Sequence, residues 1–268
     1  MSEPEIVVVP DPEVGAMRAA EIIATTLWDA VGERGDRADW ATTGGSTPIG
    51  IYKALLLPPA RDRIPWGQVH TWWGDDRFVP SDHPLSNARP FDDILLEAGG
   101  WESVHSDDRR GRVNIPAVNV HPFRTGEAIG LGEDADDCAR EMAAELKSAG
   151  LPETDGWPVF DLILLGIGGD GHILSVFPGS ATFDSRAWAL AVPAPTHIEP
   201  HVQRVTLNPA VVAVARRAIV VAYGSAKADI VATVLGVAVD PPKWPAQLAR
   251  REGATWILDE AAAAKLPR

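Results

Sequence analysis

The sequence predicts an α/β protein with a mostly parallel, open, Rossmann-like sheet, helices on both faces, and some additional strand and loop excursions. Short apolar runs rich in β-branched residues alternate with segments of helical period from one end of the chain to the other. Such runs are expected of strands in a parallel sheet whose two faces are both covered. The 268 residues are 46% hydrophobic and 23% charged, as in ordinary globular domains, and we expect residues 1–268 to form one domain.

The first strand and helix are the most clearly marked pair. Residues 6–9, Ile-Val-Val-Val, predict a strand. Asp11 can cap the helix that follows, and Pro12 suits its first position. An apolar stripe at helical spacing marks the side of this helix that is expected to be buried: Val14, Met17, Ile22, Ile23 and Leu27.

The same alternation continues along the chain. A strand at residues 38–43 leads into a helix at residues 48–57, which a Pro-Pro pair closes. Further strands are predicted at residues 69–73, 160–165, 218–223 and 255–258, with a helix at residues 226–235 and an Ala-rich tail after the last strand. Residues 133–145 predict an amphipathic helix. Residues 99–132, rich in Gly, Pro, Ser and charge, predict a long surface connection or a small excursion.

Charge and cysteine content exclude several classes of partner. Thirty-seven acidic residues against 24 basic ones leave a net charge of −13, which repels nucleic acid and anionic membrane surfaces. Because no run of 18 apolar residues is free of charge, we expect no membrane span. The single cysteine, Cys138, cannot form an internal disulfide, and the first residues lack a secretion signal, so we predict a cytoplasmic protein. We therefore expect the binding partner to be a small molecule. The oligomeric state, monomer or small homo-oligomer, is left open.

The segment Thr-Thr-Gly-Gly-Ser-Thr-Pro joins a predicted strand to a predicted helix. Gly44 and Gly45 let the backbone approach a ligand, and Ser46 and Thr47 add hydroxyl groups. The free N–H groups at the helix start favour an anion such as phosphate. The segment is no Walker A loop, because it lacks the spaced glycines and the Lys-Ser/Thr pair. Taken locally, a phosphate loop and a simple helix cap are both consistent with it.

A second glycine-rich segment, residues 166–172, follows the strand at residues 160–165. It contains G-x-G-x-x-G, but Asp170 would repel a pyrophosphate and Pro178 follows too early for the required helix, which disfavours a nicotinamide site. His172 beside Asp170 at the carboxyl end of a parallel strand suits a general base whose ring the carboxylate orients. The alternative is a histidine that only anchors the loop.

Cations are placed near other strand ends. Arg77, in Asp75-Asp76-Arg77, can hold an anionic group or a developing oxyanion, or form an exposed ion pair. Arg204 and Lys227 can neutralise a phosphate or be surface charges. His197 and His201 have the spacing of a metal-binding pair on a helix, but the proline between them opposes that helix. We therefore expect no metal and no organic cofactor.

In this order the segments resemble the 6-phosphogluconolactonase family, which shares a superfamily with the glucosamine-6-phosphate deaminases. The resemblance is carried by TTGGSTP, DDRFVPSDHPLSN, FDLILLGIGGDGHILSVFPGS, QRVTLNPAVV, GSAKADIVATVLG and ATWILDEAAAAKL. It implies hydrolysis of 6-phospho-D-glucono-1,5-lactone to 6-phospho-D-gluconate in the oxidative pentose phosphate pathway. It further implies that His172 is the base and that Asp170 and Arg77 lie in the active site. The residues that it assigns to the sugar phosphate are Gly44, Gly45, Ser46, Thr47, Arg204 and Lys227.

Departures from the family pattern bear on the activity. Lactonases usually have Asp-Glu-Arg where this chain has Asp75-Asp76-Arg77, which leaves the role of Asp76 open. Deaminases carry a glutamate five residues after the histidine, and this chain has Phe177 there, so a deaminase-like isomerase is the less favoured alternative. A non-catalytic sugar-phosphate sensor would carry a helix-turn-helix, for which we expect no room before the first strand. We predict that backbone N–H groups of Gly168 and Gly169 stabilise the oxyanion.

Overall fold

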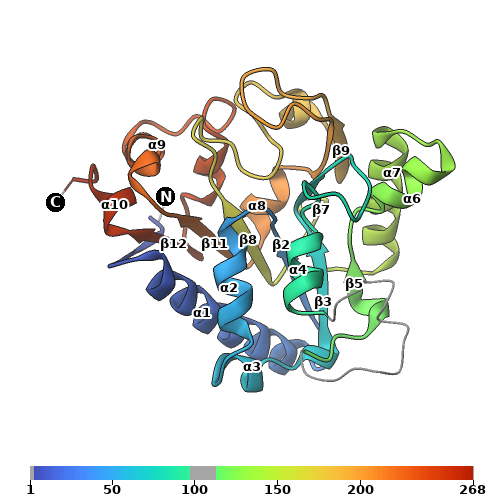
Figure 1. Ribbon diagram of the computed structural model, residues 1–268, viewed down its shortest axis with the longest axis horizontal. Helices are drawn as coiled ribbons and strands as arrows, with labels where there is room; N and C mark the ends of the chain where they lie inside the picture. Colours follow the sequence, from blue (N-terminus) through green and yellow to red (C-terminus); the bar gives the residue numbers. More distant parts are fainter. Residues whose placement is uncertain (1–2, 97–112, 268) are drawn as a thin grey trace.

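The centre of the molecule is a seven-stranded sheet, seen in the computed structural model, which describes residues 3–96 and 113–267 (Figure 1). Its strands follow the order β1-β12-β11-β8-β2-β3-β5, and every neighbouring pair is parallel. The strands are β1 (Glu5–Val9), β2 (Ala38–Thr42), β3 (Val69–Trp73), β5 (Val120–His121), β8 (Leu162–Gly166), β11 (Arg217–Ala222) and β12 (Ala254–Asp259). All their carboxyl ends therefore meet at one edge of the sheet, which confirms the predicted fold class.

Helices cover the sheet on both faces. The helices α1 (Pro12–Arg34), α2 (Thr47–Leu55), α3 (Ala60–Arg63) and α4 (Arg89–Ile94) pack along one face. Figure 1 shows α2 and α4 in front of the strands and α1 running along their lower side. After β5 the chain runs back across the sheet, and right-handed crossovers put the later helices on the other face. On that face lie α8 (Ala210–Val214) and α9 (Ala228–Gly236), with α10 (Glu260–Ala263) after the last strand. The helices α6 (Thr125–Leu131) and α7 (Ala135–Ser148) pack on each other, and α7 packs against residues 189–192 and 204–207.

A small antiparallel sheet follows the carboxyl ends of the main strands. Its order is β4-β10-β9, made of Asp75–Arg77, Arg204–Leu207 and Ala189–Val192. It is attached to the main sheet at Gly74, whose N–H donates to the carbonyl of Thr42 at 2.8 Å. A separate short hairpin joins β6 (Glu153–Thr154) to β7 (Trp157–Pro158). The sequence predicted such additional strands but not which of them pair with each other.

Most predicted elements are confirmed, with bounds that differ by a few residues. Asp11 caps α1, its Oδ1 accepting from the Val14 N–H at 2.9 Å. The prediction that Met17 belongs to the buried stripe of α1 was wrong, because Met17 is 45% exposed and small alanines pack against the sheet instead. The helix predicted at residues 226–235 is a 3₁₀ turn, η4 (Ser225–Lys227), that continues into α9.

The predicted surface connection at residues 99–132 needs a correction. Residues 99–112 lie outside the described residues, but residues 113–132 contain β5 and α6. β5 is an edge strand of only two residues, paired with β3, and so short a strand has no recognisable alternation.

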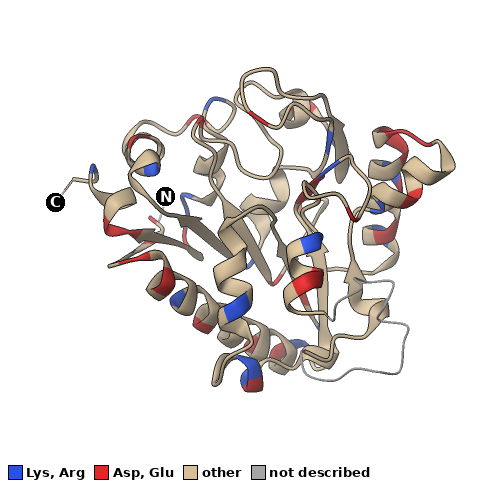
Figure 2. Ribbon diagram, in the orientation of Figure 1, with Lys and Arg blue, Asp and Glu red and all other residues tan. Residues whose placement is uncertain are grey.

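Bulky aromatic residues fill the core beside the sheet. Trp40, Trp72, Trp73 and Trp256 are completely buried, so these four of the ten tryptophans serve packing. The helices α1 and α7 carry charges of both signs, and acidic residues outnumber basic ones on each of them (Figure 2). Within the described residues, no helix has the length and apolar character to cross a membrane.

Candidate active site

The segments that follow four neighbouring strands supply the predicted site residues other than Arg204, which lies in β10. The loop of Gly44 to Thr47 follows β2, Gly74 follows β3, residues 166–172 begin at the end of β8, and η4 follows β11. Ligands of open parallel sheets bind at this edge, where loops from strands of different sequence position converge. The topology thus brings together segments that are far apart in sequence.

His172 and Asp170 form a close pair. His172 Nδ1 lies 2.6 Å from Asp170 Oδ1, and the backbone N–H of His172 donates to the same oxygen at 3.1 Å. A carboxylate at that distance assigns the ring proton to Nδ1 and leaves Nε2 with a lone pair. Burial opposes the charge of Asp170, but hydrogen bonds from His172 and His197 outweigh it and lower the pKa of this carboxyl below its ordinary value.

Glycines shape the loop that carries this pair. The N–H of Gly168 donates to the His172 carbonyl at 2.9 Å, and Gly171, with a φ of +86°, donates back to the Gly168 carbonyl at 3.0 Å. A methyl group on Gly168 would lie 2.0 Å from His172 Nδ1, so the ring occupies the space that any side chain would need. The Gly168 N–H is already engaged, which corrects its predicted oxyanion role; Gly169 keeps that role as a prediction.

Phe177 connects the histidine to the predicted phosphate-binding arginine. Its ring centroid lies 4.8 Å from that of His172 and 5.6 Å from that of His197. The guanidinium carbon of Arg204 lies 5.6 Å from the Phe177 centroid, a cation–π contact. An aromatic ring therefore occupies the position at which a deaminase would need its acid/base carboxylate.

Asp76 holds the turn that orients Arg77. Its buried carboxylate accepts the N–H of Arg77 at 2.7 Å and that of Asn87 at 2.6 Å. Burial raises the pKa of Asp76 to about 7, and the charge of Asp75 adds to the effect. The Arg77 guanidinium donates to Asn87 Oδ1 and, at 3.1 Å, to the Leu85 carbonyl. The function of Asp76 that the sequence left open is thus to anchor this turn.

Arg77 and Arg204 are direct partners in the β4–β10 ladder, although 127 residues separate them. In the part of the chain that the structure describes, the Nε of each is buried without a hydrogen-bond partner. Burial lowers the pKa of Arg204, and the charge of Arg77 lowers it further. Like charges facing each other across a ladder are unfavourable, so the pair favours a bound anion.

The loop after β2 adjoins both regions. A methyl on Gly44 would meet the Asn87 side chain at 2.2 Å, and one on Gly166 would lie 3.7 Å from Thr47 Oγ1. Gly45 has a φ of +80°, which favours glycine. Ser46 is exposed before the first turn of α2 and makes no side-chain capping hydrogen bond, so the simple-cap interpretation has no support.

Lys227 reaches the same loop cluster from η4. Its Nζ donates to the carbonyl of Ile167 at 2.6 Å. Burial lowers the pKa of Lys227, while the charge of Asp170 raises it. His201 Nδ1 lies 2.7 Å from the Pro195 carbonyl, whereas His197 contacts Asp170.

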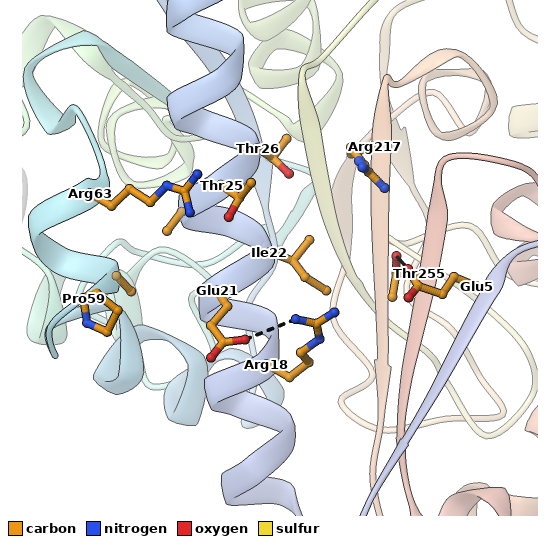
Figure 3. A pocket seen from close by; sticks show the side chains of 12 residues that line it. Glu5, Arg18, Glu21, Ile22, Thr25, Thr26, Pro59, Arg63, Arg217 and Thr255 are labelled. Atoms are coloured by element: carbon orange, nitrogen blue, oxygen red, sulfur yellow. Dashed lines mark hydrogen bonds and ion pairs between the residues drawn. The ribbon is translucent and has the colours of Figure 1, made fainter.

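A separate cavity of about 440 Å³ lies at the opposite edge of the sheet (Figure 3). Glu5, Arg217 and Thr255, which line it, stand at the amino ends of their strands, and Arg18 pairs with Glu21 beside them. None of the predicted site residues lines this cavity. We therefore place the candidate site at the carboxyl edge.

Comparison with known proteins identifies the family. Residues 10–257 match the model of the glucosamine-6-phosphate isomerases/6-phosphogluconolactonase family. The chain belongs to this family. A 6-phosphogluconolactonase of Streptomyces coelicolor is 34% identical over 99% of this chain and 95% of its own length. One of Synechocystis sp. is 30% identical over 98% of each.

Solved structures of family members share the fold. The 6-phosphogluconolactonase of Trypanosoma brucei matches with a TM-score of 0.80 and 28% identity over 100% of both chains. A monomeric glucosamine-6-phosphate deaminase has the same fold, with a TM-score of 0.74 and 20% identity. The predicted family and fold class are confirmed, and the lactonase interpretation is better supported than its alternatives.

Sequence reasoning missed residues that act through their neighbours. Asn87 connects Gly44, Arg77 and Asp75, its Nδ2 donating to the Asp75 carbonyl at 2.9 Å. Ser175 Oγ donates to Asp75 Oδ2 at 2.5 Å and so ties the segment after His172 to β4. Asn and Ser in polar turns have no distinctive signal, and only their place after the strand ends could have marked them.

Proposed function

We propose that this family member hydrolyses 6-phospho-D-glucono-1,5-lactone to 6-phospho-D-gluconate, the second step of the oxidative pentose phosphate pathway. One observation carries the proposal. His172, oriented by Asp170 at 2.6 Å, lies at the strand edge where the Gly44–Thr47 loop, Arg204 and Lys227 also converge. A base for water and a binding site for a phosphate dianion are the two functions that this reaction requires.

His172 acts as base and then as acid. Its Nε2 takes a proton from water as the water oxygen attacks the lactone carbonyl carbon, and the carbonyl electron pair moves onto the oxygen. The tetrahedral intermediate collapses, the bond from this carbon to the ring oxygen breaks, and the imidazolium returns its proton to that oxygen. Asp170 keeps the Nδ1–H in place and stabilises the imidazolium charge.

The developing oxyanion is stabilised by Arg77 and by the Gly169 N–H. A well-placed donor contributes about 3 kcal/mol to such a transition state. The sugar phosphate is held by the hydroxyls and backbone N–H groups of the loop from Gly44 to Thr47, with Arg204 and Lys227 supplying positive charge. These cations matter because the chain as a whole carries a charge of −13 and repels a dianion.

A coupled assay tests the proposal. Glucose-6-phosphate dehydrogenase makes the lactone in place, and 6-phosphogluconate dehydrogenase reports the product above the rate of spontaneous hydrolysis. We expect rapid turnover by the wild-type protein, and a loss of 10³-fold or more in His172→Ala, as when a catalytic base is removed from a hydrolase. Near-normal turnover in the variant would remove the base assignment. Absence of turnover in the wild type, with ammonia release from glucosamine 6-phosphate, would establish the deaminase instead.

A further inference from the structure

Asp170 contacts two histidines, one on each carboxylate oxygen. Oδ1 lies 2.6 Å from Nδ1 of His172, and Oδ2 lies 2.9 Å from Nε2 of His197. His172 comes from the same loop, two residues away, but His197 comes from the segment between β9 and β10. A hydrogen-bond partner on Oδ1 alone would leave the carboxylate free to rotate about its Cβ–Cγ bond, whereas partners on both oxygens fix the plane of the carboxylate.

The segment that carries His197 is itself held in place. His201 Nδ1 lies 2.7 Å from the Pro195 carbonyl, and Arg204 donates to the Pro200 carbonyl at 3.1 Å. The His197 ring also meets Phe177 edge to face, with an interplanar angle of 85°. The segment ends in Arg204, so the position of His197 is tied to the arginine assigned to the phosphate.

His197 and Asp170 both border open space beside the site. A cavity of about 670 Å³ adjoins the site and is lined by Asp170, His197 and Trp244, among others. The His197 side chain is 52% exposed, while that of Asp170 is only 20% exposed. Removing the imidazole would let water compete for Oδ2 of Asp170, and a hydrated, rotating carboxylate orients a neighbouring ring less well.

We propose that His197 is a positioning residue, which holds Asp170 so that Asp170 in turn orients the His172 base. The inference rests on the proposed lactonase function and adds to it a residue outside the glycine-rich loop. Within the described residues, no hydrogen bond or ion pair joins His197 to an assigned phosphate-binding residue, so its removal should affect kcat far more than KM. The Nε2–H that it donates to Asp170 has a close equivalent in the amide N–H of glutamine, which lies at a similar distance from the backbone.

The experiment compares His197→Ala, His197→Gln and His201→Ala in the coupled assay. We expect His197→Ala to lose about tenfold in kcat with KM changed less than twofold, a smaller loss than the 10²-fold that a 1 Å misplacement causes. His197→Gln should recover most of the loss. His201→Ala loosens the same segment, because it removes the hydrogen bond to the Pro195 carbonyl, and should lose clearly less than His197→Ala. An equal loss there would mean that loosening of the segment explains the effect.

A double-mutant cycle isolates the route through Asp170. In an Asp170→Asn background, His197→Ala should change kcat by less than twofold, because the carboxylate that it positions is gone. An undiminished tenfold effect in that background, or no effect in the wild-type background, would overturn the inference. If the wild-type protein has no lactonase activity, the proposed function fails first; if it is active and His197→Ala equals it, only the role of His197 fails.

Discussion

Substitution of one loop glycine should inactivate the enzyme without unfolding it. In Gly168→Ala the new methyl would lie 2.0 Å from His172 Nδ1, 2.2 Å from Cε1 and 2.7 Å from Asp170 Oδ1. Ordinary van der Waals contact begins at about 3.4 Å, so the ring must move by more than about 1 Å. Phe177 packs against the same ring at 4.8 Å between centroids, so the movement breaks the hydrogen bond to Asp170.

The expected loss follows from that displacement. A misplacement of about 1 Å in a catalytic group costs about 10²-fold in rate, which corresponds to about 2.7 kcal/mol of transition-state stabilisation. We therefore expect Gly168→Ala to lower kcat by 10²-fold or more. KM should change little, because the three atoms nearest the new methyl belong to His172 and Asp170 and not to the predicted phosphate-binding residues.

The neighbouring glycine offers a matched control. A methyl on Gly169 meets nothing within 4 Å, and Gly169 does not have a positive φ. Gly169→Ala keeps the backbone N–H assigned to the oxyanion and should remain within a few-fold of wild type. Both variants are measured in the coupled assay, with thermal unfolding as the check of the fold. A Gly168→Ala protein that keeps kcat within threefold would refute the geometric argument, as would an equal loss in the control.

Three further predictions concern the cations and the buried carboxyl. Lys227→Ala should mainly raise KM, by about tenfold, because it removes a charge assigned to the phosphate, and an unchanged KM in steady-state kinetics would count against that role. Arg204→Lys, which keeps the charge but loses the planar guanidinium over Phe177, should also weaken substrate binding, measurable as competition by 6-phosphogluconate. Burial raises the pKa of Asp76 from 3.8 to about 7, so between these pH values the folded protein holds a proton that the unfolded chain releases. The free energy of unfolding should therefore fall, by on the order of 4 kcal/mol, as the pH rises from about 4 to 7. In Asp76→Asn the amide oxygen still accepts both backbone N–H groups, and urea unfolding at pH 5 and pH 8 should lose this dependence; the same slope in both proteins would contradict the assignment.

Local sequence patterns determine the βα units and the composition of the site. Some features affect only residues close to them in the sequence, so they can be recognised without knowledge of distant contacts. These features are the apolar β-branched runs, Asp11 as a helix cap and the glycines around His172. The same holds for Gly44 to Thr47, whose position between a strand and a helix follows from neighbouring residues alone. The family resemblance then assigned roles to these residues, because the motifs occur along this chain in the same order as in the family.

Tertiary structure alone decided which of these segments meet. Arg77 faces Arg204 only because β4 pairs with β10 in one register, and a shift by one residue would turn the side chains to the other face. His197 reaches Asp170, and Ser175 reaches Asp75 across 100 residues, through loops whose own sequences carry no periodic signal. The sequence also did not show that the Gly168 N–H, which it predicted as an oxyanion donor, donates to the His172 carbonyl. Register and side-chain direction depend on packing between elements distant in the chain, and a linear pattern of residue types does not contain that information.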